Sequence, residues 1–171
     1  EKKHMRENRS EIVLKAFLRP ALEKLNPQLP PAAFDQVMEE LTRDRSAMTL
    51  VNANEQVWHL LRDGVSVEIE KDGETTQERV RLIDFEQPDN NHFLLVSQLW
   101  VTGEMHTRRP DLVGYINGIP LVLFELKASH KHLKNAYQQN IRDYKDTIPQ
   151  IFWYNAFIVL SNGIEAKVGT L

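Results

Sequence analysis

The chain has 171 residues, of which 42% are hydrophobic and 26% charged, and its formal net charge at pH 7 is −3. This length fits one domain with a real core, and the charge balance lacks the basic footprint of many nucleic-acid-binding domains without excluding DNA as a partner. The absence of cysteine excludes disulfide bonds and thiolate metal sites.

The chain shows no sign of a membrane segment. Its apolar runs are all shorter than the roughly 18 residues needed to span a bilayer, and the N-terminal EKKHMRENRSE lacks the apolar core of a signal peptide. These features predict a protein without membrane contact, and the absence of cysteine favours a reducing, cytoplasmic setting. Because the chain starts without methionine and ends where a strand is under way, we expect residues 1–171 to be a single domain within a longer chain.

The first third of the chain has helical spacing. Ser10 is a suitable N-cap for the first helix, Pro20 predicts a kink or break in it, and Asp63-Gly64 ends the third. The predicted helices cover residues 11–25, 32–43 and 54–61.

In the next segment of the chain, apolar and polar residues alternate with a period of two. VSVEIE and ERVRLIDF flank the turn KDGETT and predict a hairpin with a polar outer face, and residues 91–102 predict a longer strand.

Residues 111–127 predict a hairpin that carries the candidate functional residues. Two apolar runs are joined by Asn117-Gly118, a hairpin signal, and both faces are apolar, which favours a central place in the sheet. Folding about Gly118 places Asp111 opposite Glu125, about 4.5–5.5 Å apart at Cβ. Lys127 shares the face of Glu125 because side chains alternate along a strand. Two carboxylates and an ammonium group would therefore converge at the open end.

The rest of the chain predicts a helix and a strand. Residues 130–146 are polar, with apolar and aromatic residues on one face, and Thr147-Ile148-Pro149 ends the helix. NAFIVLSNG predicts a buried strand. The order of elements predicts an α/β fold in which helices flank a mixed central β-sheet.

The hairpin end offers oxygen ligands to a hard cation. Mg²⁺ takes one or two carboxylates and keeps several waters, so Asp111, Glu125 and the backbone carbonyl of Leu126 are candidate ligands. Lys127 could orient a metal-bound water or neutralise charge on a phosphate.

The tripeptide Glu125-Leu126-Lys127 alone does not establish a metal site. Glu165-Ala166-Lys167 repeats the pattern without an upstream Asp in hairpin register. A strand-end salt bridge, with Glu125 and Lys127 solvated, is the alternative interpretation.

The wider sequence adds a resemblance. Pro110-Asp111, thirteen residues and Glu125-Leu126-Lys127 resemble the PD-(D/E)xK nuclease signature. RRPDLVGYINGIPLVLFELKAS and HLKNAYQQNIRDYKDTIPQIFWYNAFIVLSNG, with LRPALEKLNPQLP and VNANEQVWHLLRDGV upstream, are similar to the N-terminal nuclease domain of the R subunit of type I restriction–modification enzymes. The resemblance implies a restriction-endonuclease-like core that hydrolyses phosphodiester bonds of double-stranded DNA with Mg²⁺, for which Mn²⁺ is a surrogate. Asp111 and Glu125 would then be metal ligands and Lys127 the catalytic lysine.

The family also carries a Gln-x-x-x-Tyr element on the following helix. Tyr144 matches its tyrosine as a supporting residue, whereas the residue four places earlier is Asn140 and Gln139 lies one further back, so a role for Gln139 departs from the pattern. Many relatives of the superfamily add an acidic residue from an early helix. The candidates here are Glu11, Glu23 and Glu55.

The resemblance also implies partners outside this chain. They are a methyltransferase subunit, a specificity subunit and ATP-dependent motor domains, and the chain itself has no GxxxxGK(S/T) loop for ATP. A non-catalytic DNA-binding module and a subunit-docking domain are the alternative functions.

Four cations near the hairpin are candidate contacts to DNA phosphates, with a solvated surface as the alternative. They are Arg108, Arg109, Lys131 and Lys134. The three tryptophans, Trp58, Trp100 and Trp153, lie in apolar segments and are predicted to be in the core.

Overall fold

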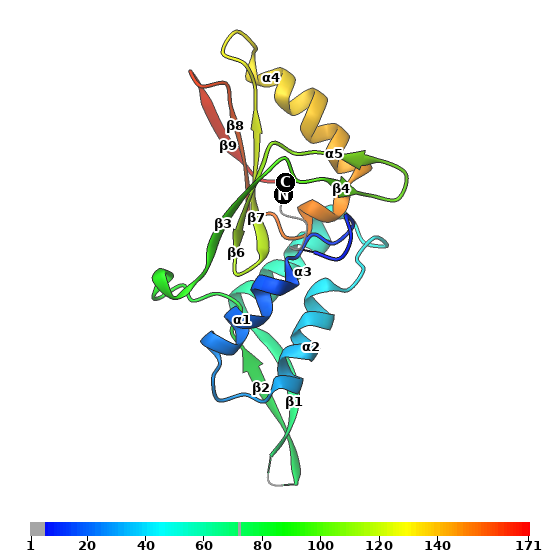
Figure 1. Cartoon of the computed structure of the whole chain (residues 1–171). Helices are drawn as coiled ribbons and strands as arrows, with labels where there is room; N and C mark the ends of the chain where they lie inside the picture. The colour runs from blue at the N-terminus through cyan, green and yellow to red at the C-terminus, as the bar shows by residue number, and fades with distance from the viewer. Residues whose placement is uncertain (1–5, 72) are drawn as a thin grey trace.

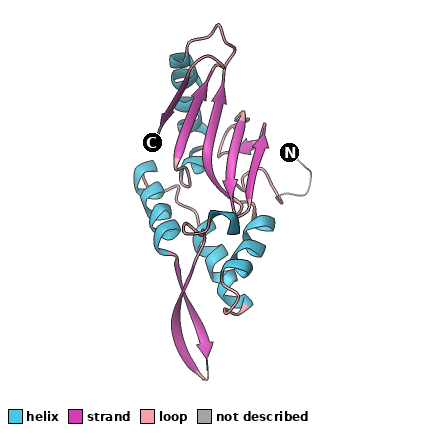
Figure 2. Ribbon diagram, turned by 90° about the vertical axis from the view of Figure 1, so that its left-hand side faces the viewer, coloured by secondary structure: helices cyan, strands magenta, loops and turns pink. Residues whose placement is uncertain are grey.

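A five-stranded mixed sheet forms the centre of the computed structural model, which describes residues 6–71 and 73–171, except for the side chains of Asn135 and Ala136. The strand order is β3-β6-β7-β8-β9; only β7 and β8 are parallel (Figures 1 and 2). The β6–β7 hairpin is therefore central, as predicted. The strands are β3 (Phe93–Ser97), β6 (Leu112–Ile116), β7 (Ile119–Leu126), β8 (Phe157–Ser161) and β9 (Ala166–Gly169).

Three helices pack near the turn end of this hairpin and carry a projecting two-stranded ribbon (Figure 1). They are α1 (Lys15–Leu25), α2 (Pro31–Thr42) and α3 (Leu50–Asp63). The ribbon consists of β1 (Val65–Lys71) and β2 (Glu74–Val80), paired from Val65 with Val80 to Lys71 with Glu74. The second strand thus begins four residues earlier than the sequence predicted, and Asp72 in the turn lies outside the described residues. No helix in the described part of the chain has both the length and the apolar character needed to cross a membrane.

The predicted helix after β7 covers one face of the sheet, but its middle is wider than an α-helix. It runs as α4 (Leu133–Asn135), a π-helical segment (Ala136–Ile141) and α5 (Arg142–Thr147), followed by a 3-10 turn (Pro149–Phe152). Leu133, Ile141 and Tyr144 are buried beneath it. On the other face of the sheet, Phe93 and Leu95 remain more than half exposed, at 58% and 56%.

The start of α1 differs from the prediction. Ser10 does not cap it; the Ser10 hydroxyl donates to the side chain of Asn8 (2.6 Å), and the helix begins at Lys15. Residues 12–14 are not helical and are buried, and the Leu14 N–H donates to the Gly118 carbonyl (2.8 Å). Apolar burial of this segment against the hairpin turn therefore outweighs its helical spacing. The helix continues through Pro20 without a break.

The predicted strand over residues 91–102 is interrupted. Gln98 has a φ of 53°, a left-handed conformation that ends β3, and a short second ladder follows between β4 (Val101–Thr102) and β5 (Thr107–Arg108). The interruption turns the chain away from the sheet before it returns into β6.

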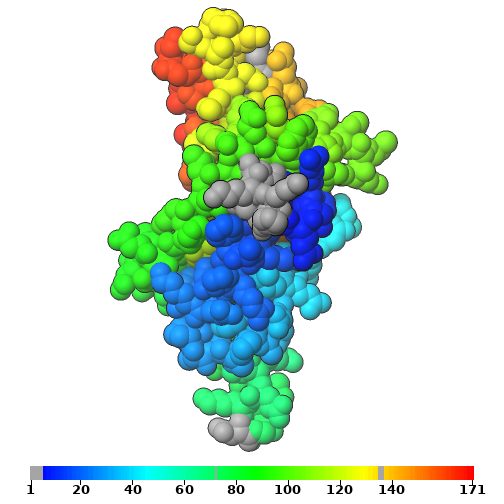
Figure 3. All heavy atoms as spheres, viewed as in Figure 1, coloured from blue at the N-terminus to red at the C-terminus, as the bar shows by residue number. Residues whose placement is uncertain are grey.

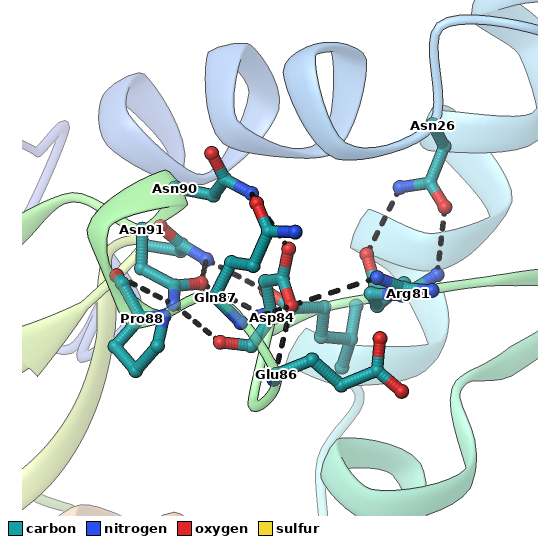
Figure 4. Close-up of polar contacts among 10 residues, drawn as sticks. Asn26, Arg81, Asp84, Glu86, Gln87, Pro88, Asn90 and Asn91 are labelled. Atoms are coloured by element: carbon teal, nitrogen blue, oxygen red, sulfur yellow. Dashed lines mark hydrogen bonds and ion pairs between the residues drawn. The ribbon is translucent and has the colours of Figure 1, made fainter.

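The turn of the β6–β7 hairpin is fixed by its own backbone and by side chains around it. Asn117 and Gly118 have φ values of 52° and 80°, as a two-residue type I′ turn requires. The buried Asn117 side chain donates to the Leu82 carbonyl (2.8 Å) and to Asn91 (2.9 Å). Asn91 in turn belongs to the loop organised by Asp84 (Figure 4).

A bulge in β7 sets the register toward the open end. Gly114 pairs with Val122 but Tyr115 pairs with Pro120, so Leu121 is an extra residue. Without it, Asp111 would lie opposite Phe124 instead of Glu125. The bulge therefore brings the two carboxylates level.

Candidate active site

The open end of the β6–β7 hairpin brings Asp111, Glu125 and Lys127 together, as the sequence predicted. The last ladder pair is Leu112 with Phe124, so the next positions along the two strands are Asp111 and Glu125. Asp111 Oδ2 accepts a hydrogen bond from the Leu126 N–H (2.7 Å). Because the N–H and C=O of a strand residue point to the same side, the Leu126 carbonyl also faces the Asp111 side.

Glu125 is buried, which contradicts the interpretation of a solvated strand-end pair. Its side chain is 2% exposed, and that of Lys127 is 20% exposed. Glu125 Oε1 accepts from Lys127 Nζ (3.0 Å) and from Asn140 Nδ2. Glu125 Oε2 accepts from the Tyr144 hydroxyl (3.2 Å). Three donors, one directly after β7, one in the π-helical segment and one in α5, thus fix one carboxylate inside the protein.

The electrostatics of the pair favour a cation between the carboxylates. Burial raises the pKa of Glu125, and the negative charge of Asp111 raises it further, while Lys127 and Tyr144 act in the opposite direction. Burial and the nearby Glu125 charge raise the pKa of Tyr144, so its hydroxyl stays protonated and donates. A divalent cation beside the carboxylates would relieve their mutual repulsion.

Known sequences identify the family to which this arrangement belongs. A sequence model described as "Type I restriction enzyme R protein N terminus" matches residues 1–171. The chain belongs to this family.

Two relatives illustrate the similarity. The chain is 42% identical over 175 residues to the type I restriction enzyme HindI endonuclease subunit of Haemophilus influenzae, a match that covers 100% of the chain and 16% of that subunit. It is 33% identical over 171 residues to the putative type I restriction enzyme MjaIXP endonuclease subunit of Methanocaldococcus jannaschii, covering 96% of the chain and 16% of the relative. The chain therefore spans about one sixth of the length of these curated relatives.

In this R-protein N-terminal domain, the helix after β7 supplies two donors to Glu125, and only one was predicted. Tyr144 is in place, but the second donor is Asn140; Gln139 is exposed and forms no hydrogen bond within the described residues. The spacing of four residues could have indicated this, because residues i and i+4 share one helix face.

The early acidic candidates do not reach the site. Glu11 binds Lys15 (3.2 Å) and Glu23 binds Arg19 (3.3 Å), while Glu55 is exposed on α3. In residues 6–71 and 73–171, no three His, Cys, Asp or Glu side chains form a group that could hold a metal. The donor set at the hairpin is thus two carboxylates and a carbonyl. It fits Mg²⁺, which commonly binds one or two protein carboxylates and retains water.

The four residues predicted to contact DNA phosphates differ in their surroundings. Arg108 forms a two-point ion pair with Asp143 of α5, with Nη2–Oδ1 at 2.8 Å. Arg109 is exposed beside Trp100, and Lys131 and Lys134 are exposed after β7. Asp143 directly precedes Tyr144, which binds Glu125. The ion pair with Arg108 therefore connects α5 to the segment that leads into Asp111.

Proposed function

We propose that this chain is the Mg²⁺-dependent endonuclease domain of a type I restriction enzyme R subunit, and that it hydrolyses phosphodiester bonds of double-stranded DNA. The observation that carries the proposal is the buried Glu125 carboxylate, which lies level with Asp111 and is bound by Lys127. A buried carboxylate next to a second one is costly for the fold, and such groups cluster at functional sites, which favours a functional role.

Each residue has a distinct role in the proposal. Asp111, Glu125 and the Leu126 carbonyl hold the cation, which when bound polarises a phosphoryl oxygen and makes water a better nucleophile. Lys127, 3.0 Å from Glu125, places a positive charge where negative charge develops on the phosphate. Asn140 and Tyr144 keep the Glu125 carboxylate in one orientation.

The other parts of the proposed assembly lie outside this chain. Sequence recognition, methylation and ATP-driven translocation are assigned to a specificity subunit, a methyltransferase subunit and motor domains. The relatives are named endonuclease subunits, which supports placing the cutting step in this family.

The decisive experiment compares two lysines in the full-length protein. Lys127→Ala should abolish DNA cleavage and leave ATP-driven translocation nearly intact. Lys167→Ala is the matched control, because Glu165-Ala166-Lys167 repeats the Glu-x-Lys pattern at the start of the exposed strand β9; its cleavage should equal that of the parent. Equal cleavage by both variants would leave a DNA-binding or docking role, and loss of translocation with Lys127→Ala would indicate a folding or assembly defect.

Metal binding is tested separately with Mn²⁺ in place of Mg²⁺. The parent should bind Mn²⁺, and Asp111→Ala and Glu125→Ala should both lose that binding while remaining folded. Equal binding by all three proteins would refute the assignment of the two ligands.

A further inference from the structure

Trp100 lies at the surface with two arginines against its ring, although the sequence predicted it in the core. Its side chain is 38% exposed. The guanidinium carbons of Arg109 and Arg9 lie 5.0 and 5.2 Å from the ring centroid. Arg109 reaches the ring because the β4–β5 ladder pairs Val101 with Arg108, which leaves Trp100 and Arg109 at the next opposed positions.

Arg9 comes from the N-terminal segment, far from Trp100 and Arg109 in the sequence. The Thr102 N–H donates to the Arg9 carbonyl (2.9 Å), so the N-terminal segment runs alongside β4. Figure 3 shows this segment, in dark blue, beside the green surface formed by the middle of the chain. The cluster of Arg9, Trp100 and Arg109 therefore depends on tertiary contacts.

Neither guanidinium is neutralised by a carboxylate of the described residues. Within the described residues, no Asp or Glu forms an ion pair with Arg9 or Arg109, whereas Arg108 is paired with Asp143. The carboxylate of Glu11, close to Arg9 in the sequence, is occupied by Lys15 and by the Glu7 N–H (2.8 Å). An aromatic ring orients a cation but leaves its full charge available to an anion.

The cluster adjoins the candidate active site. Arg109 precedes Asp111 by two residues, which span at most about 7 Å of chain. On the other side, the N–H of Gln98, two residues before Trp100, donates to the Asp111 carbonyl (2.8 Å). Both connections place Trp100 and its arginines next to the residue assigned to hold the metal.

We propose that Arg9, Trp100 and Arg109 form a binding surface for the DNA backbone, taking a phosphate beside the one that is cleaved. A planar guanidinium group can bind two phosphate oxygens at once. Because both guanidinium groups are held near the Trp100 ring, they are ordered before DNA binds. Such contacts position the duplex without reading its sequence. The inference rests on the proposed function for its substrate, double-stranded DNA.

The test is the salt dependence of DNA binding by the full-length protein, measured by fluorescence anisotropy with a labelled duplex in EDTA so that no cleavage occurs. Each of Arg9→Ala and Arg109→Ala should reduce the slope of log K against log salt by about 1, and the double variant by about 2, for any duplex sequence. Arg62→Ala is the control. Arg62 is equally an exposed arginine but is bound to Asp63 at the end of α3, and its removal should leave the slope unchanged.

Two further variants test the stacked arrangement. Arg109→Lys keeps the charge and should keep the slope, and Trp100→Leu should weaken binding about twofold to fivefold with little change in slope. Slopes and affinities of the Arg9 and Arg109 variants equal to those of the parent would overturn the proposal.

The salt dependence, read together with the cleavage assay of the Lys127 variant, separates this inference from the proposed function. Cleavage that depends on Lys127, with unchanged slopes, would refute only the binding surface. Reduced slopes in a protein that does not cleave DNA would support the surface and refute the nuclease assignment.

Discussion

Replacing Tyr144 by phenylalanine tests whether the helix after β7 stabilises the buried carboxylate. In the described residues, the Tyr144 hydroxyl is the only side-chain donor to Glu125 Oε2, while Oε1 has Lys127 and Asn140. Because Glu125 is 2% exposed, bulk water has little access to the oxygen that loses its partner. The variant removes one oxygen atom and keeps the aromatic ring.

The expected cost follows from this contact. Loss of a hydrogen bond to a buried charged group reduces stability by about 1.5–3 kcal/mol. In a domain of this size, about 2 kcal/mol lowers the unfolding temperature by about 4–8 °C. Release of the carboxylate from its fixed orientation should also weaken Mn²⁺ binding by about 10- to 100-fold, as for other groups that orient metal ligands.

Thermal unfolding and Mn²⁺ titration of the chain measure the two effects. Tyr137→Phe is the matched control: Tyr137 lies on the same helical run but is exposed, and its contact with Lys145 involves the ring, which phenylalanine keeps. Its stability should stay within about 0.5 kcal/mol of the parent. If Tyr144→Phe behaves like this control in both assays, the Tyr144 hydroxyl does not support Glu125 and the reasoning is wrong.

Three further predictions concern the surroundings of the site. Asp143→Arg should weaken Mn²⁺ binding by displacing α5, and the added Arg108→Asp exchange should restore it; no recovery in the double variant would contradict the positioning role. Hydrogen bonds from Asn90 and from backbone N–H groups lower the pKa of Asp84, so its carboxylate stabilises the fold above the unfolded pKa of about 3.9, and this contribution is lost as pH falls through the lower native value. Asp84→Asn should therefore unfold more easily at pH 7 and approach the parent in acid, with Mn²⁺ binding unchanged; denaturation curves offset equally at every pH would contradict this. Gly118→Ala, with φ at +80° and the new Cβ against the Leu14 carbonyl, should lose more than about 1 kcal/mol in urea unfolding, and an unchanged midpoint would contradict it.

Features that depend on local pattern were predictable from the sequence. Asn117-Gly118 predicted the hairpin turn, and the apolar faces of the hairpin predicted its central position in the sheet. Gly64 predicted the end of α3. The register of β6 and β7 leaves Asp111 and Glu125 at the next opposed positions, as predicted, but it requires the bulge at Leu121. Pro120, directly before it, is the local signal, because a proline within a central strand favours a bulge.

Features that depend on distant segments were not predictable. The π-helical segment and the contact of Asn140 with Glu125 follow from how the helix packs on the sheet. Burial of residues 12–14 against the hairpin turn moved the start of α1, because a long-range contact outweighed local helical spacing. The stack of Arg9 on Trp100 likewise joins segments far apart in the chain.

The dipeptide Arg108-Arg109 shows how one short strand serves both sides of the site. Successive residues of a strand point to opposite faces, so Arg108 binds Asp143 on α5 while Arg109 lies against Trp100. Arg108 is neutralised and acts on the helix that holds Glu125; Arg109 keeps its charge for an anion. Because Asp111 follows two residues later, the same segment carries one proposed metal ligand, a support for the other proposed ligand and a candidate phosphate contact. A one-residue shift in this segment would exchange the two arginines and should disturb metal binding and DNA binding together.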